Sequence, residues 1–200
     1  MSDAHSKGSN RAAGKVRWRR FAIVAVPAVA VAGTLIGLTA EGAIASSISV
    51  SGQAFTISAS QLSGTNFEQF GGAVSESNGT QHPVMVSAIG NANLTNLCQS
   101  VSVFGLTLRL TAGDAGTPAN AQNLIVDADS QTGSSATFTN ITIGQDAGTL
   151  TEVPGVTGPA GTFGEQADSV VINNLRQDTW LTTAGTFTLP DLSLGFGGSC

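Results

Sequence analysis

The chain has 200 residues, of which 41% are hydrophobic and 10% are charged, and its net charge is −5 at pH 7. After Ala45 it holds two basic and eleven acidic side chains, so that part carries a net charge of −9. Two arginines cannot neutralise a run of phosphates. The composition therefore excludes nucleic acid as a partner and disfavours anionic lipid headgroups.

The first 45 residues are expected to direct the chain out of the cytoplasm. Residues 1–15 are polar and basic, which predicts a disordered cytoplasmic tail. Residues 16–45 contain the uncharged run Phe21–Thr39, and a helix of that length nearly crosses a hydrocarbon core of about 30 Å. Because the basic residues before the run hold that side in the cytoplasm, we expect a transmembrane anchor or a signal peptide. A buried core helix is the remaining alternative.

Two fates of this segment stay open. Ala43-Ile44-Ala45 has the small-x-small form of a signal-peptidase site, which would place a new N-terminus at Ser46. The apolar run is longer than the roughly 7–15 residues of a signal peptide, which favours a retained membrane anchor. The sequence therefore predicts either a cell-membrane protein with its domain outside, or a secreted protein cleaved near Ala45.

Residues 46–200 have the pattern of an extracytoplasmic all-β domain. Short runs such as Phe55–Ala59 alternate apolar and polar side chains. Val101–Val103 alternates in one phase and Leu106–Leu110 in the other, which predicts a turn or bulge at Phe104-Gly105. Clusters of Gly, Pro, Asn and Asp separate the runs, and no helical period is sustained. One all-β core is expected.

Two architectures fit this pattern. Four segments begin with an Ala followed by a short polar/apolar run, and their starts are 29, 15 and 31 residues apart. Spacings near multiples of fifteen favour a solenoid-like stack of short strands, with small and β-branched residues inside and Asn at the corners. A two-sheet β-sandwich also spaces short strands regularly and is the alternative. The segments are Ala92–Leu97, Ala121–Val126, Ala136–Ile141 and Ala167–Ile172.

The only cysteines are Cys98 and Cys200, and both follow the apolar run. In an oxidising compartment two cysteines most simply pair with each other. Such a bridge would tie the end of the chain to the middle of the domain. An intermolecular bridge or a reactive thiol is the alternative interpretation.

A hydrolase active site would need a nucleophile and a base. No G-x-S-x-G pentapeptide occurs in the sequence. His82 is the one histidine after the apolar run that could serve a Ser-His-Asp triad. It lies between the turn residues Asn78-Gly79 and Pro83, so a surface or turn histidine is the simpler interpretation. We assign no catalytic residue.

Metal sites have equally little support. Asp127, Asp129 and Gly133 have a spacing similar to that of a calcium loop, but Phe138 stands where the bidentate Glu of an EF-hand would be. A solvated acidic pair is the simpler interpretation. One histidine and two distant cysteines do not make a typical zinc site. We expect no metal and no cofactor.

Paired carboxylates could also indicate a glycosidase. Glu165, Asp168 and Asp178 could supply such a pair, but a carbohydrate cleft normally needs aromatic platforms. Trp180 is the only Trp after the apolar run. We therefore give the glycosidase interpretation little weight.

Four parts of the chain carry a resemblance to a known family. They are the N-terminal segment and the stretches Asn91–Val101, Phe138–Asp146 and Gln177–Phe187 with the final Cys200. They resemble an uncharacterised family of exported or membrane-anchored actinomycete proteins, some of which carry the label cholesterol esterase. The resemblance implies an exported location and supplies no catalytic residues.

Two hypotheses for function follow. The first is a non-enzymatic cell-envelope or extracellular protein with a structural or interaction role, whose strand edges offer a route to self-association or to an envelope partner. The second is a lipid-ester hydrolase, as the label of the similar family suggests. A carrier of a small apolar ligand is a further alternative.

Overall fold

The computed structural model of the protein describes residues 48–114 and 116–200. The predicted cytoplasmic tail (1–15) and the predicted apolar segment (16–45) lie outside the described residues. Within residues 48–114 and 116–200, no helix has the length and apolarity needed to cross a membrane. This part is all-β, as the alternating sequence pattern predicts, with a single short 3-10 turn, η1 (Ala147–Thr149).

Eleven strands of the described part belong to one sheet. Two of them, β2 and β9, have 22 and 21 residues, far more than the usual five or six. The strands are β1 (Ser49–Val50), β2 (Phe55–Glu76), β3 (Gln81–Thr95), β4 (Leu97–Val103), β5 (Leu106–Ala112), β6 (Ala119–Thr132), β7 (Ser135–Thr139), β8 (Thr142–Asp146), β9 (Phe163–Thr183), β10 (Thr186–Thr188) and β11 (Ser193–Phe196).

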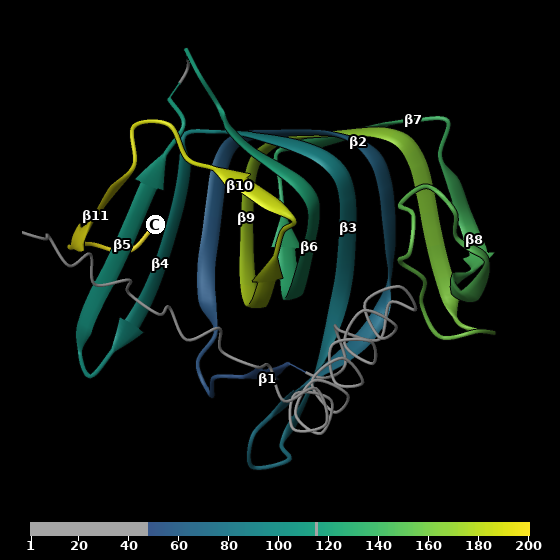
Figure 1. The fold of residues 1–200 in the computed structure, drawn as a ribbon, viewed down its shortest axis with the longest axis horizontal. Helices are drawn as coiled ribbons and strands as arrows, with labels where there is room; N and C mark the ends of the chain where they lie inside the picture. The colour runs from purple at the N-terminus through teal and green to yellow at the C-terminus, as the bar shows by residue number, and fades with distance from the viewer. Residues whose placement is uncertain (1–47, 115) are drawn as a thin grey trace, which may run out of the picture. The chain divides into compact units, whose positions relative to one another are not determined.

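The strands follow the order β11-β5-β4-β2-β3-β6-β9-β7, with β1 added to β2, β10 to β6 and β8 to β9 (Figure 1). Pairing is antiparallel except between β1 and β2. Because β2 also pairs with β9, the strands β2, β3, β6 and β9 form a closed ring of pairings. This ring surrounds the main core.

The long strands bend where asparagine adopts a left-handed conformation. Asn66 has a φ of 57° and lies opposite Gly90 on one side and Asp168 on the other. On the far side of Gly90, Asn123 (φ 50°) of β6 lies opposite it. On the far side of Asp168, Asn140 (φ 53°) donates a hydrogen bond of 2.6 Å to the Asp168 carboxylate. Asn visits this conformation more readily than most residues. The first row of bends therefore crosses five neighbouring strand segments.

A second row of bends lies six residues away from the first, on the side of the roof that contains Ser60 and Asn174. Asn174 (φ 51°) donates a hydrogen bond to Ser134, and Asn96 (φ 52°) donates one to Ser60. The backbone N–H of Asn96 bonds the carbonyl oxygen of Gly113. Asn thus alternates with Ser or Gly across the second row, as it alternates with Gly or Asp across the first.

These two rows divide the sheet into three panels, which Figure 1 shows as a roof with strands descending on both sides. The roof includes β7 and residues 61–65, 91–95, 119–122 and 169–173. The first wall continues β2, β3 and β9 beyond Asn66, and it includes β8 and residues 124–128 of β6. The second wall continues β2 and β9 beyond Ser60 and includes β4, β5 and β11.

The sequence predicted Asn at corners, and Asn96, Asn123 and Asn140 of the four Ala-led segments do lie at bends. The strands are longer than the predicted short ones. The reason is that a left-handed residue turns the strand without ending it, so hydrogen bonding resumes on the next panel. Phe104 and Gly105 form the predicted turn, between β4 and β5.

The main core lies under the roof between the walls. Phe67, Leu175 and Val170 are among its most buried side chains, and Phe67 packs against the ring of Phe138. A cavity of about 30 Å³ remains inside, with Ser87, Gln99, Gln131, Gln177 and Thr182 among its lining residues. That volume holds on the order of two water molecules. It is far below the roughly 300–1,000 Å³ of a ligand pocket.

A loop that contains η1 covers the outside of the first wall. Phe70, Ala147 and Leu150 form a small apolar cluster under this loop. The fully buried Glu68 accepts a hydrogen bond of 2.8 Å from the backbone N–H of Val153. Burial raises the pKa of Glu68, although hydrogen bonds from the loop backbone partly oppose the shift. Glu68 therefore fastens the loop to the wall.

Candidate functional site

The second wall extends beyond β2 as three strands, β4, β5 and β11, whose side chains of one face are apolar. Side chains alternate between the two faces of a strand, and the register aligns one apolar set across the three strands. Val101 lies opposite Leu108, which lies opposite Phe196. We call this set the apolar face. It consists of Val101, Val103, Leu106, Leu108, Leu110, Leu194 and Phe196, with Phe104 at the β4–β5 turn.

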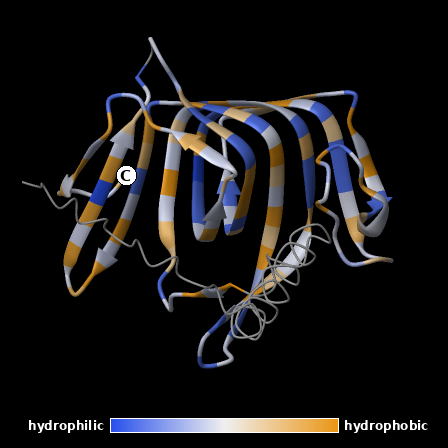
Figure 2. Cartoon of the chain, in the orientation of Figure 1, coloured by the Kyte–Doolittle hydropathy of each residue, from blue (hydrophilic) through white to orange (hydrophobic). Residues whose placement is uncertain are grey.

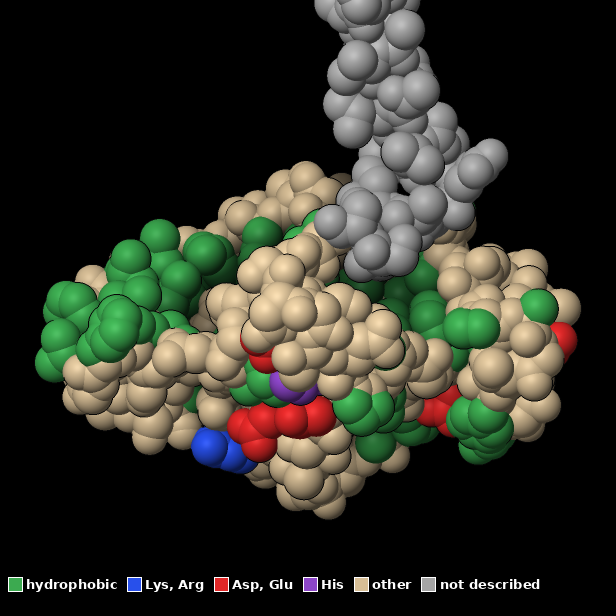
Figure 3. Space-filling view, turned by 90° about the horizontal axis from the view of Figure 1, so that it is seen from below, with side chains coloured by type: hydrophobic (Ala, Val, Ile, Leu, Met, Phe, Trp, Pro, Cys, Tyr) green, Lys and Arg blue, Asp and Glu red, His purple; other side chains and the backbone are tan. Residues whose placement is uncertain are grey.

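This apolar face is open to solvent in the described part of the chain. The exposed fraction is 101% for Phe104, 75% for Phe196, 62% for Leu194 and 59% for Leu106. Figure 2 shows the hydrophobic residues at the free ends of these strands, and Figure 3 shows hydrophobic side chains gathered at the same end. Contiguous apolar patches of several hundred Å² are rare on monomers and often mark interaction sites.

The turn at the tip of the apolar face has an unfavourable residue in it. Phe104 and Gly105 both have positive φ, 52° and 78°, as in a type I′ hairpin turn, which favours Asn, Asp or Gly at these positions. A left-handed conformation costs a residue such as Phe roughly 1–2 kcal/mol. The demands of the turn therefore do not explain the fully exposed aromatic ring.

The opposite face of the same strands is polar, and a disulfide attaches the end of the chain to it. Cys98 and Cys200 are bonded, 102 residues apart, as expected for the intramolecular pairing. The N–H of Cys200 donates to Ser100, its carbonyl oxygen accepts from Arg176, and Arg109 contacts Cys98 Sγ. The end of the chain is thereby fixed on the polar face, and the apolar face is left uncovered.

A groove of about 320 Å³ runs beside the apolar face. Ser51, Gln53 and Phe55 line one side of it, just after β1. The other side is lined in part by Val101 and Leu194. The point at which the chain enters the described fold therefore adjoins the apolar face.

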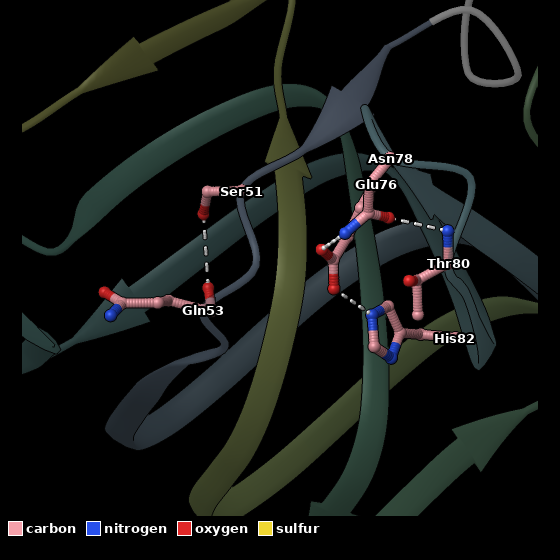
Figure 4. Close-up of polar contacts among 6 residues, drawn as sticks. All are labelled: Ser51, Gln53, Glu76, Asn78, Thr80 and His82. Atoms are coloured by element: carbon pink, nitrogen blue, oxygen red, sulfur yellow. Dashed lines mark hydrogen bonds and ion pairs between the residues drawn. The ribbon is translucent and has the colours of Figure 1, made fainter.

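His82, the histidine considered for a catalytic triad, lies on β3 next to the β2–β3 turn. Its Nε2 is 2.8 Å from Oε1 of Glu76, and its ring stacks on Trp180 with centroids 3.7 Å apart. Asn78 donates a second hydrogen bond to Glu76. Figure 4 shows that nearby Ser51 donates to the carbonyl oxygen of Gln53 and not to His82. These contacts stabilise the turn between β2 and β3.

The acidic residues considered for a calcium loop lie in strand β6. Asp127 is buried (3% exposed), and burial raises its pKa to about 6. Asp129 lies next to an irregularity in the β6–β9 register and is exposed. No group of three or more potential ligands from His, Cys, Asp and Glu comes together in residues 48–114 and 116–200.

The three carboxylates considered for a glycosidase lie apart along the bent strand β9. Asp168 is at the first row of bends, where it accepts from Asn140. Asp178 is beyond the second row and accepts from Thr56 and Ser130. Glu165 is on the first wall, and burial raises its pKa. The structure does not bring the three together.

Sequence reasoning identified the alternating runs of β4 and β5 but did not identify the apolar face. Alternation shows that Val101 and Val103 lie on one face of their strand, and the same pattern is expected when that face is buried. The signal that could have distinguished the two cases is Phe104. An aromatic residue in front of Gly105, where a turn favours Asn or Asp, indicates a side chain retained for contact.

Comparisons with known proteins show one family that matches this chain. A family model described as "Family of unknown function (DUF6230)" matches residues 51–200. No curated protein matches the chain, and no solved structure matches it.

Proposed function

We propose that this chain, which belongs to the family of unknown function DUF6230, is a non-enzymatic interaction protein of the cell envelope or extracellular space. Its apolar face is the surface that binds. The observation that carries this proposal is the set of exposed side chains on β4, β5 and β11, headed by Phe104 and Phe196.

Magnitudes support a binding role for this surface. At roughly 200 Å² per aromatic side chain, Phe104 and Phe196 together expose about 350 Å². Burying that area would contribute about 9 kcal/mol at 25 cal/mol per Å², before the cost of association. The leucines of the same face add to it. A surface of this kind is costly to leave in water.

The proposal includes an exported location. The uncharged run Phe21–Thr39, with basic residues before it, supports a membrane anchor with the β domain outside, or a secreted domain after cleavage near Ala45. The disulfide between Cys98 and Cys200 is consistent with an oxidising compartment. The net charge of −9 after Ala45 argues against nucleic acid as the partner.

We further interpret the fold as solenoid-like. The two rows of Asn bends, such as Asn66 and Asn96, act as the corners of a solenoid. Long antiparallel strands that cross both rows take the place of successive parallel rungs. A two-sheet sandwich is the alternative, in which the two walls are the sheets.

Site-specific photo-crosslinking in the producing cell tests the interaction role. A photoreactive residue replaces Phe104 in the full chain, and the matched control replaces Phe163, which is 59% exposed at the start of β9. We expect adducts from position 104 and few from position 163. Equal and low yields at both positions would show that the apolar face binds nothing in its native setting.

A further inference from the structure

We propose that the occupant of the apolar face is the interfacial region of a phospholipid bilayer, into which Phe104 and the neighbouring leucines insert. This inference rests on the proposed interaction role and names its partner. Its starting point is a turn whose fully exposed aromatic ring stands at the free end of a hairpin.

The backbone pairing of the hairpin suits the interfacial region of a bilayer. Every residue of β4 pairs with one of β5, up to Val103 opposite Leu106 at the turn. Unpaired backbone groups in hydrocarbon cost several kcal/mol each. The outer edge of β4 pairs with β2 only over Cys98–Ser100, so the backbone at the tip stays in the hydrated headgroup region while the apolar side chains insert. β11 covers the second edge of β5 over four residues and ends in Phe196.

Charge favours lipid over a protein surface as the occupant. Residues 97–108 and 192–200 contain no charged side chain. A protein–protein interface normally surrounds its apolar centre with a polar rim, and the polar neighbours of this end, such as Ser51 and Gln53, are uncharged. The nearest cation on these strands, Arg109, lies on the opposite face, where its Nε donates to Cys98 Sγ.

The same charges restrict the kind of lipid. The part after Ala45 has a net charge of −9, so an anionic bilayer repels it. Insertion must therefore be driven by apolar burial and must prefer uncharged, zwitterionic headgroups. Salt should screen the repulsion from anionic lipid.

The length of the N-terminal connector places a bilayer within reach. Nine residue steps separate Thr39, the end of the apolar run, from Ile48, and they span at most about 30 Å. Ser51 and Gln53 line a groove with Val101 and Leu194 of the apolar face. Figure 1 shows β1 and the β4–β5 turn on the same lower side. An anchor in the bilayer would thus hold this end close to the membrane surface.

Quenching by brominated lipid tests this directly. The full chain is reconstituted into phosphatidylcholine vesicles with brominated acyl chains, as the Phe104→Trp variant and as the matched Phe163→Trp control. The unmodified chain supplies the background from Trp18 and Trp180. We expect the added emission of Phe104→Trp to be blue-shifted and to fall at least about twofold, as for a ring at the acyl boundary. The emission of the control should be unchanged.

A second variant and a second lipid sharpen the test. Phe196→Trp replaces an exposed ring outside the turn and should also be quenched, which keeps the test valid if the turn does not accept Trp. Adding an anionic phospholipid should weaken quenching for both variants, and raising the salt concentration should restore it. The opposite trend would overturn the proposal.

The remaining outcomes separate this inference from the proposed function. An emission that is blue-shifted and unaffected by bromine, and that depends on protein density, would identify a second copy of the chain as the occupant. That result would overturn the lipid inference and leave the interaction role standing. An emission that stays red-shifted and unquenched at every density would overturn the lipid inference and exclude a second copy as the occupant, and the photo-crosslinking in the producing cell would then decide the interaction role.

Discussion

Replacing Phe104 by Asn should stabilise the fold and abolish docking at the same time. Phe104 has a φ of 52° and is 101% exposed, so its ring contributes no packing to the described part of the chain. Asn tolerates this conformation and is favoured in a type I′ turn. Removing a cost of roughly 1–2 kcal/mol for the left-handed Phe should raise the free energy of unfolding by about 1 kcal/mol.

Urea denaturation of the full chain, followed by the fluorescence of Trp18 and Trp180, measures this change. The same preparation is tested for loss of the photo-crosslinks formed by the apolar face, with the photoreactive group now placed at position 106. The control is Phe163→Asn, which also removes an exposed ring but should leave the crosslinks unchanged. A Phe104→Asn variant that unfolds more easily than the original would show that the ring packs in the folded protein, and would refute this reasoning.

Three further changes test the fold. Asn66→Ala should lower the free energy of unfolding by about 1 kcal/mol because Ala resists a φ of 57°, whereas Asn66→Gly should be tolerated in the same urea titration. Cys98→Ala should lower it by up to about 4.7 kcal/mol, as expected for a bridge between residues 102 apart, and an equally stable variant would contradict this. Burial raises the pKa of Asp127 to about 6 from 3.8. The folded state therefore binds the proton more tightly, so stability falls as the pH rises through this window. Asp127→Asn should then gain up to about 3 kcal/mol at pH 7.5 and little at pH 4. The exposed Asp129→Asn control should gain little at either pH.

The strands and the bends between them differ in how far the sequence predicts them. Alternation identifies β4 and β5, and the change of phase identifies the turn at Phe104-Gly105. Alternation does not predict the length of a strand, because Asn66 turns β2 without interrupting its pairing with β3 and β9. A strand that continues through a bend looks in sequence like two short ones. The pattern therefore predicted shorter strands.

The candidate site depends on information that the sequence lacks. The alternation of Leu106 and Leu108 is the same whether their face is buried or open. The outcome depends on which strands pair across the core. The ring of β2, β3, β6 and β9 closes without β4, which pairs with β2 only over Cys98–Ser100. The apolar side of β4 and β5 therefore extends past the covered part. The cysteine pairing was simpler to predict, because two cysteines allow one intramolecular bridge.

Hydroxyl-radical footprinting of the full chain in intact membranes of the producing cell tests the central claim most directly. Mass spectrometry compares oxidation of Phe104 and Phe196 with oxidation of Phe163 and Ile143, exposed side chains at the other end of the sheet. If the apolar face is a docking surface, Phe104 and Phe196 are protected in the membrane, while Phe163 and Ile143 are oxidised. Equal oxidation of all four would mean that the apolar face is free in the cell, and the interaction role would have to be abandoned.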